Sequence, residues 1–149
     1  MSLLPHRRRR ARPLAPPVPA PRAAWERLSA VVNEAIVLQD STERLLVEIS
    51  DEGPLAELAQ RGGPVISRLE ALRFELPPAA DPELRRWTEL VDPLLAHHAL
   101  VLHSALALLS ANWRSERMVE ELHKIDGLGR PAQRLEQLKL ELDARLGGA

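Results

Sequence analysis

The sequence predicts an all-α fold, an antiparallel bundle of about four helices that follows a disordered arm rich in arginine and proline. Three observations support this prediction. Apolar residues make up 45% of the chain but aromatic residues only 3%, so leucine, alanine and valine dominate, which suits helices. The apolar residues recur at threes and fours in long segments. Proline, glycine and aspartate separate these segments, and 149 residues suffice for one domain with a single core.

The predicted arm comprises residues 1–22. It contains six arginines and no acidic residue, whereas the rest of the chain has 14 basic residues against 21 acidic ones, a net charge of −7. Its prolines favour extended polyproline II structure. The arginines can contact phosphate groups, so nucleic acid or another polyanion is the alternative partner, and a solubilising tail is the other interpretation. The residues that would bind the polyanion are Arg7, Arg8, Arg9, Arg10 and Arg12.

Residues 23–149 are the predicted bundle domain, with its first helix at 23–50 and its second at 54–76. Gln39 and Thr42 lie on the apolar stripe of the first helix, either as core polar groups that fix register or on a half-buried face. Within the second helix, the sequence Gly62-Gly63-Pro64 predicts a break or a sharp kink, because these residues destabilise a helix interior.

The central helix is predicted at residues 93–112, a run without any charged residue. Asp92-Pro93 either begins a new helix or kinks one long helix that starts at Pro82. After Asn112, either the helix breaks and Ser115 caps a new one, or one helix continues to residue 125. The run is amphipathic, carries three histidines and is near the lower length limit of a membrane span, so we expect a cytoplasmic protein without a membrane partner.

The three histidines of this run do not have the spacing of a metal site. Two ligands on one helix normally stand three or four residues apart, whereas His97 and His98 are adjacent and His103 is five residues further on. His98 is predicted to be a core or interface residue and the other two to face solvent. The chain has no cysteine, no phosphate-binding loop and no nucleophile motif. We therefore expect a non-enzymatic protein with no catalytic residue, no metal and no cofactor.

The last helix, predicted at residues 132–146, has the most regular amphipathic stripe of the chain, after a glycine-containing connector at 126–131. It either completes the bundle or detaches and binds a helical segment of another protein or of a second copy, and both monomer and dimer stay open. In the second case the partner-binding residues are Leu135, Leu138, Leu142 and Leu146.

Residues 45–72 resemble a segment of flagellar FlgN-type export chaperones, in which a long helix, a short turn and a helix with paired Leu-x-x-Leu spacings follow one another. The matching positions are Asp51, Gly53, Leu55, Leu58, Leu69 and Leu72, with further counterparts in Asn112 and Gly129-Arg130. The resemblance covers about residues 25–146, although Gly62-Gly63-Pro64 and the basic arm depart from it. It implies a cytoplasmic chaperone that masks the helical terminus of a secreted filament protein, with the four leucines in its client surface.

Overall fold

The structure is a computed structural model that describes residues 16, 18–78, 80–111 and 115–148. All regular structure in these residues is helical, which confirms the all-α prediction. The helices are α1 (Arg22–Ser50), α2 (Leu55–Glu75), α3 (Pro82–Ser110), α4 (Glu116–His123) and α5 (Arg130–Gly147). The predicted number of about four corresponds to the four long helices, to which the short α4 is added. Because α1 begins at Arg22, this arginine belongs to the bundle and not to the arm.

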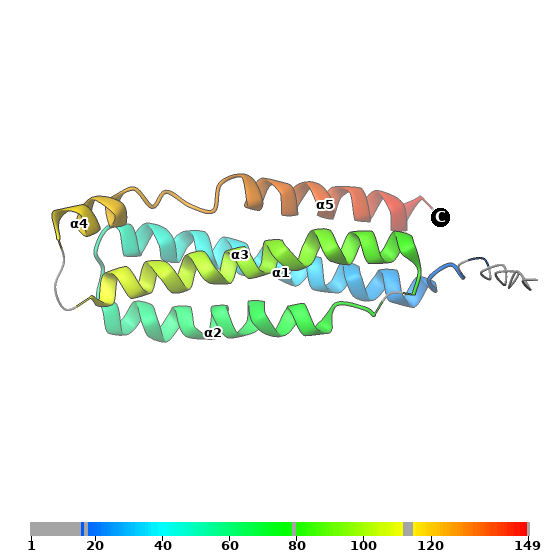
Figure 1. Ribbon diagram of the computed structural model, residues 1–149, viewed down its shortest axis with the longest axis horizontal. Coiled ribbons are helices and arrows are strands. Elements are labelled where there is room, and N and C mark those ends of the chain that lie inside the picture. The colour runs from blue at the N-terminus through cyan, green and yellow to red at the C-terminus, as the bar shows by residue number, and fades with distance from the viewer. Residues whose placement is uncertain (1–15, 17, 79, 112–114, 149) are drawn as a thin grey trace, which may run out of the picture.

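The helices α1 and α3 form the middle of the bundle, with α2 on one side of them and α5 on the other (Figure 1). Both α2 and α5 contact α1 and α3, but within the described residues α2 and α5 do not contact each other. The connections between α1, α2 and α3 are short, so these three helices alternate in direction, whereas α5 is reached only through α4 and an extended connector. The last long helix is therefore added to the edge of a three-helix unit.

The core consists of two groups of buried residues, one toward each end of the bundle. One group joins the first half of α1 and the first half of α3 to the end of α2 and to α5, and it includes Trp25, Leu28, Leu69, Leu95 and Leu138. The other group joins the second halves of α1 and α3 to the start of α2, to α4 and to the connector. Because α5 contributes leucines to the first group, it is part of the hydrophobic core in this structure.

The predicted break at Gly62-Gly63-Pro64 is wrong, since α2 continues through these residues. Gly62 is buried, and a Cβ atom there would lie 2.9 Å from Cδ1 of Leu106 on α3. The missing side chain thus lets α2 and α3 approach closely. Leu58 before the glycines and Leu69 after them are both fully buried, so packing on α3 and α1 holds the two halves of α2 in one helix against their low propensity.

Replacing Pro64 with alanine is expected to raise the free energy of unfolding by about 1–3 kcal/mol. Pro64 is exposed and lies inside α2, where it provides no N–H group for the preceding turn, and alanine restores that hydrogen bond without entering the core. Urea unfolding followed by circular dichroism measures the change. A destabilised Pro64→Ala variant would show that the proline shapes α2 in a way that the packing requires.

The third helix is continuous across Pro93, so the alternative of one long helix is confirmed. It starts at an N-cap, Asp81, whose side chain accepts a hydrogen bond from the Leu84 N–H at 3.0 Å. After α3, the alternative of a new helix with Ser115 as its cap is also confirmed, because the Ser115 hydroxyl accepts from the Met118 N–H. Asn112 lies outside the described residues.

By length and composition alone, α3 is apolar enough to cross a membrane. In the bundle, 33% of its most apolar window is buried, and α3 contacts each of the other four helices. The core helix of a soluble protein also meets these criteria of length and composition, so one such helix is weak evidence for a membrane span.

Candidate functional site

The four leucines of the last helix lie on the face of α5 that packs on α1 and α3. Leu135, Leu138 and Leu142 are buried, and Leu146 is half-buried against the same core group. Helical spacing of three and four residues places all four on one side, as the sequence predicts. In this structure they complete the bundle, so a partner that binds these leucines has to take the place of α1 and α3.

A chain of polar side chains crosses the bundle underneath the middle of α5. His98 of α3 and Gln39 of α1 are both buried, and Nε2 of His98 lies 2.8 Å from Oε1 of Gln39. The amide of Gln39 donates its own hydrogen bond to the carboxylate of Glu136 on α5, at 3.0 Å. Since a carboxylate only accepts, this arrangement assigns the proton of the neutral His98 ring to Nε2. The three residues join α3, α1 and α5 at one level of the bundle.

The burial of His98 lowers its pKa to about 4, because a charged ring there would lose its hydration. The Leu94 carbonyl, one turn earlier on α3, favours a proton on the ring, and His97 opposes it. Nδ1 of His98 is buried without a well-formed hydrogen bond, so one polar atom of the chain is unsatisfied. The prediction of a core histidine at position 98 is confirmed. His103 is exposed as expected, whereas His97 is half-buried beside His98.

The end of α5 is fixed by aromatic and charged contacts. Trp25 of α1 meets Trp87 of α3 edge to face, with ring centroids 6.2 Å apart. The guanidinium of Arg145 stacks on Trp25, 3.8 Å from the ring centroid, and also forms an ion pair with Glu83 of α3. Cation–π and bidentate contacts of this kind constrain orientation more than apolar packing does. Arg145 therefore sets the rotation of α5 on the α1–α3 surface.

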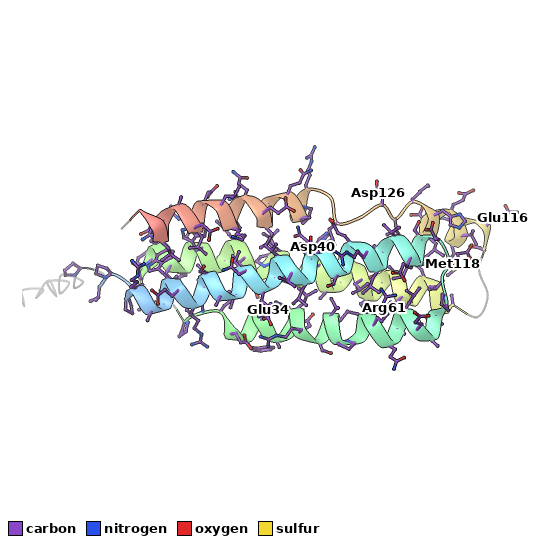
Figure 2. The ribbon with its side chains drawn as sticks, turned by 180° about the vertical axis from the view of Figure 1, so that it is seen from behind. Glu34, Asp40, Arg61, Glu116, Met118 and Asp126 are labelled. Carbon is purple, nitrogen blue, oxygen red and sulfur yellow. The ribbon has the colours of Figure 1, made fainter. Side chains whose placement is uncertain are left out.

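The other end of α5 is attached by a connector whose burial in the core was not predicted from the sequence. Leu128 is only 4% exposed and packs with Leu122 of α4 and Ala132 of α5. On either side of it, Gly127 and Gly129 have φ angles of +136° and +66°, values that favour glycine. Figure 2 shows Asp126 at the start of this extended segment. A single leucine between two glycines thus anchors the approach to α5.

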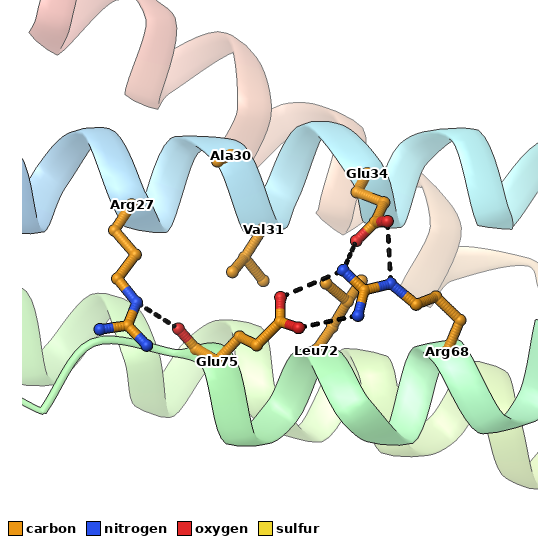
Figure 3. Close-up of a pocket in the computed structure, with 7 residues that line it drawn as sticks. All are labelled: Arg27, Ala30, Val31, Glu34, Arg68, Leu72 and Glu75. Atoms are coloured by element: carbon orange, nitrogen blue, oxygen red, sulfur yellow. Dashed lines mark hydrogen bonds and ion pairs between the residues drawn. The ribbon is translucent and has the colours of Figure 1, made fainter.

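A separate groove of about 420 Å³ lies between α1 and α2 (Figure 3). Arg68 crosses it and forms ion pairs with Glu34 at 2.6 Å and Glu75 at 2.7 Å, and these raise the pKa of Arg68 further above its ordinary value. The side chain of Arg27 donates to the main-chain carbonyl of Glu75 at 3.0 Å. Two arginines and two glutamates give the groove no net charge, and their ion pairs and hydrogen bonds hold α1 on α2.

Within the described residues, no three histidine, aspartate or glutamate side chains come together in a way that could hold a metal ion. The polyanion-binding candidates Arg7, Arg8, Arg9, Arg10 and Arg12 lie outside the described residues. Comparison of the chain with protein-family models, with curated proteins and with solved structures gives no match.

Proposed function

We propose that this chain is a non-enzymatic helical module that binds a helical segment of another protein in the cytoplasm, as an export chaperone or adaptor does. The binding surface would be the leucine face of α5 after it leaves the α1–α3 pair. The observation that carries the proposal is the attachment of α5, which covers one edge of a three-helix unit and is joined to it by a connector with two glycines. Helix-in-groove recognition uses an amphipathic helix of this form.

The contacts of α5 are compatible with its release. Its apolar anchor consists of three buried leucines and Ala132. The contacts of Arg145 and of the Leu146 carbonyl lie at the surface, where water can replace them, whereas the buried Gln39 amide that donates to Glu136 reaches water only when α5 leaves. The α1–α2–α3 unit keeps its mutual contacts when α5 leaves, because α2 packs on both α1 and α3. The resemblance of residues 45–72 to flagellar export chaperones supports the export-chaperone form of this proposal. In that form the client is a secreted filament protein.

A crosslink between α5 and α3 tests this proposal. The chain has no cysteine, so the double replacement Glu83→Cys and Arg145→Cys provides two unique thiols at a position where the native side chains form an ion pair. A short bis-maleimide should close α5 on α3. We expect the crosslinked protein to lose the protein partner that is captured from native lysate under nuclease treatment.

The matched control is the same double variant with its thiols blocked singly, which should retain the partner. Equal capture by the crosslinked and singly blocked proteins would contradict the proposal, because binding would then not require α5 to move. Polyanion binding through Arg7–Arg10 and Arg12 stays a prediction of the sequence. It would be supported if deletion of residues 1–22 removed every captured species and nucleic acid were recovered without nuclease.

A further inference from the structure

The surface that α1 and α3 present to α5 fits one particular pattern of side chains. Its apolar part belongs to the core group that contains Leu135, Leu138 and Leu142 of α5. Its polar part binds α5 at two levels. The buried Gln39 amide donates to Glu136, at 3.0 Å, and Arg145, nine residues after Glu136, stacks on a tryptophan of α1 and pairs with a glutamate of α3. A helix that fits this surface needs three leucines, a carboxylate and, about 13 Å further along, a cation.

We propose that two copies of this chain exchange their last helices, so that α5 of each copy occupies the α1–α3 surface of the other in a two-fold symmetric dimer. The inference rests on the proposed release of α5 from its own α1–α3 pair, and it goes further because it names the partner. The α5 helix of a second copy reproduces the contacts of the closed chain, from the leucines to Glu136 and Arg145. Exchange of an identical element is a low-cost route to a dimer, because the interface already exists within one chain.

The connector before α5 provides the hinge that this exchange needs. Residues 125–129 lie between α4 and α5 without helical structure and run along the bundle in an extended form (Figure 1). Gly127 and Gly129 already have positive φ angles, and glycine also adopts the other backbone conformations that a change of chain direction requires. The three-helix unit stays together when the connector opens, because α2 packs on both α1 and α3. Opening at the connector therefore frees α5 as one piece.

The chemistry of the uncovered surface favours α5 of a second copy over an unrelated helix. When α5 leaves, its three leucines and the apolar residues beneath them become exposed together, and Gln39 loses its acceptor. An amphipathic helix with leucines alone would cover the apolar area but would leave the Gln39 amide buried without a partner, which is unfavourable. The α5 sequence supplies the carboxylate at the correct level. The concentration of the protein then decides how often α5 comes from a second copy, because the tethered helix competes at a high effective concentration.

Two single-cysteine variants of the full chain, Glu83→Cys and Arg145→Cys, test the exchange directly. They are unfolded together in urea, refolded at high protein concentration and treated with a short bis-maleimide. The native chain has no cysteine, so a link between positions 83 and 145 joins two copies. We expect this link to be the major product, because exchange places position 145 of one copy beside position 83 of the other. The matched control pairs Glu83→Cys with Leu140→Cys, since Leu140 is 70% exposed on α5 and should react only by random collision.

A complementary pair of variants tests whether the exchanged helix makes the contacts of the closed chain. Gln39→Glu alone places a second carboxylate beside Glu136, whereas Glu136→Gln supplies an amide at that level. In a refolded mixture, exchange sets the amide at position 136 of one copy against the carboxylate at position 39 of the other. Native mass spectrometry should therefore show the mixed dimer in at least about tenfold excess over the Gln39→Glu homodimer.

Equal linking at positions 140 and 145, or a mixed dimer in no more than the random proportion to the Gln39→Glu homodimer, would overturn the exchange. The failure of this inference is distinguishable from the failure of the proposed function. If capture of another protein still required α5 to open while neither mixture showed exchange, the inference would be wrong and the proposed function would stand. An α5 helix that never opens would contradict both.

Discussion

Replacing Leu138 and Leu142 together with alanine is expected to cost roughly 4–10 kcal/mol of the free energy that docks α5, since each buried leucine-to-alanine change costs about 2–5 kcal/mol. Both side chains are at most 1% exposed and pack in the core group shared with α1 and α3. The loss is comparable to the whole stability of a typical domain. Circular dichroism should therefore show a lower thermal midpoint and less helix.

The control for this variant is Leu140→Ala in the same helix. Leu140 is mostly exposed, so its replacement removes a similar side chain without opening a cavity, and the free energy of unfolding should change by less than about 0.5 kcal/mol. If the double variant kept the thermal midpoint of the native chain, α5 would not pack on α1 and α3 in solution. The core group that joins α5 to α1 and α3 would then not form in solution.

Lowering the pH from about 6.5 to about 4 is expected to destabilise the protein by roughly 3 kcal/mol through His98 alone. The folded state holds the pKa of this ring at about 4, whereas the unfolded chain has the ordinary value of 6.5. Between these two pH values the unfolded state binds a proton that the folded state does not. The contribution of His98 is therefore complete above pH 6.5 and is lost as the pH falls to 4.

Denaturant unfolding at a series of pH values, in the native chain and in His98→Leu, isolates this effect. Carboxylates with lowered pKa values, such as Glu48, also reduce stability in acid, and they do so equally in both proteins. The difference between the two profiles should grow from pH 4 to pH 6.5, whereas the exposed-site variant His103→Gln should follow the native chain. Parallel profiles for the native chain and His98→Leu would show that His98 is hydrated or charged in the folded state.

The sequence predicted the helices more accurately than the contacts between them. Periodicity placed the ends of α1 within one residue and those of α5 within two, and cap chemistry identified Ser115, because these signals act within one turn of the chain. The glycines and proline in α2 misled the prediction because local propensity cannot account for tertiary packing. Gly62 is required by the approach of Leu106, a residue that lies 44 positions later in the sequence.

The candidate site was predicted only in part. The leucine stripe of α5 was read correctly as one face, but the sequence could not decide whether that face was covered. Gln39 and His98 were each suspected to be buried, yet their pairing and the link to Glu136 depend on the relative rotation of α1, α3 and α5. Leu128 was missed, and an apolar residue between two glycines in a connector is the signal that could have marked it.

Hydrogen exchange of the intact protein, resolved by segment with mass spectrometry, tests most directly whether α5 is a separable helix. We expect the amides of α5 to exchange through an opening of lower free energy than the one that exposes the buried turns of α1 and α3. The Glu83→Cys/Arg145→Cys crosslink should abolish this difference. If α5 exchanged only with global unfolding, at the same protection as α1 and α3, it would be a permanent part of the core, and partner binding through its leucines would be contradicted.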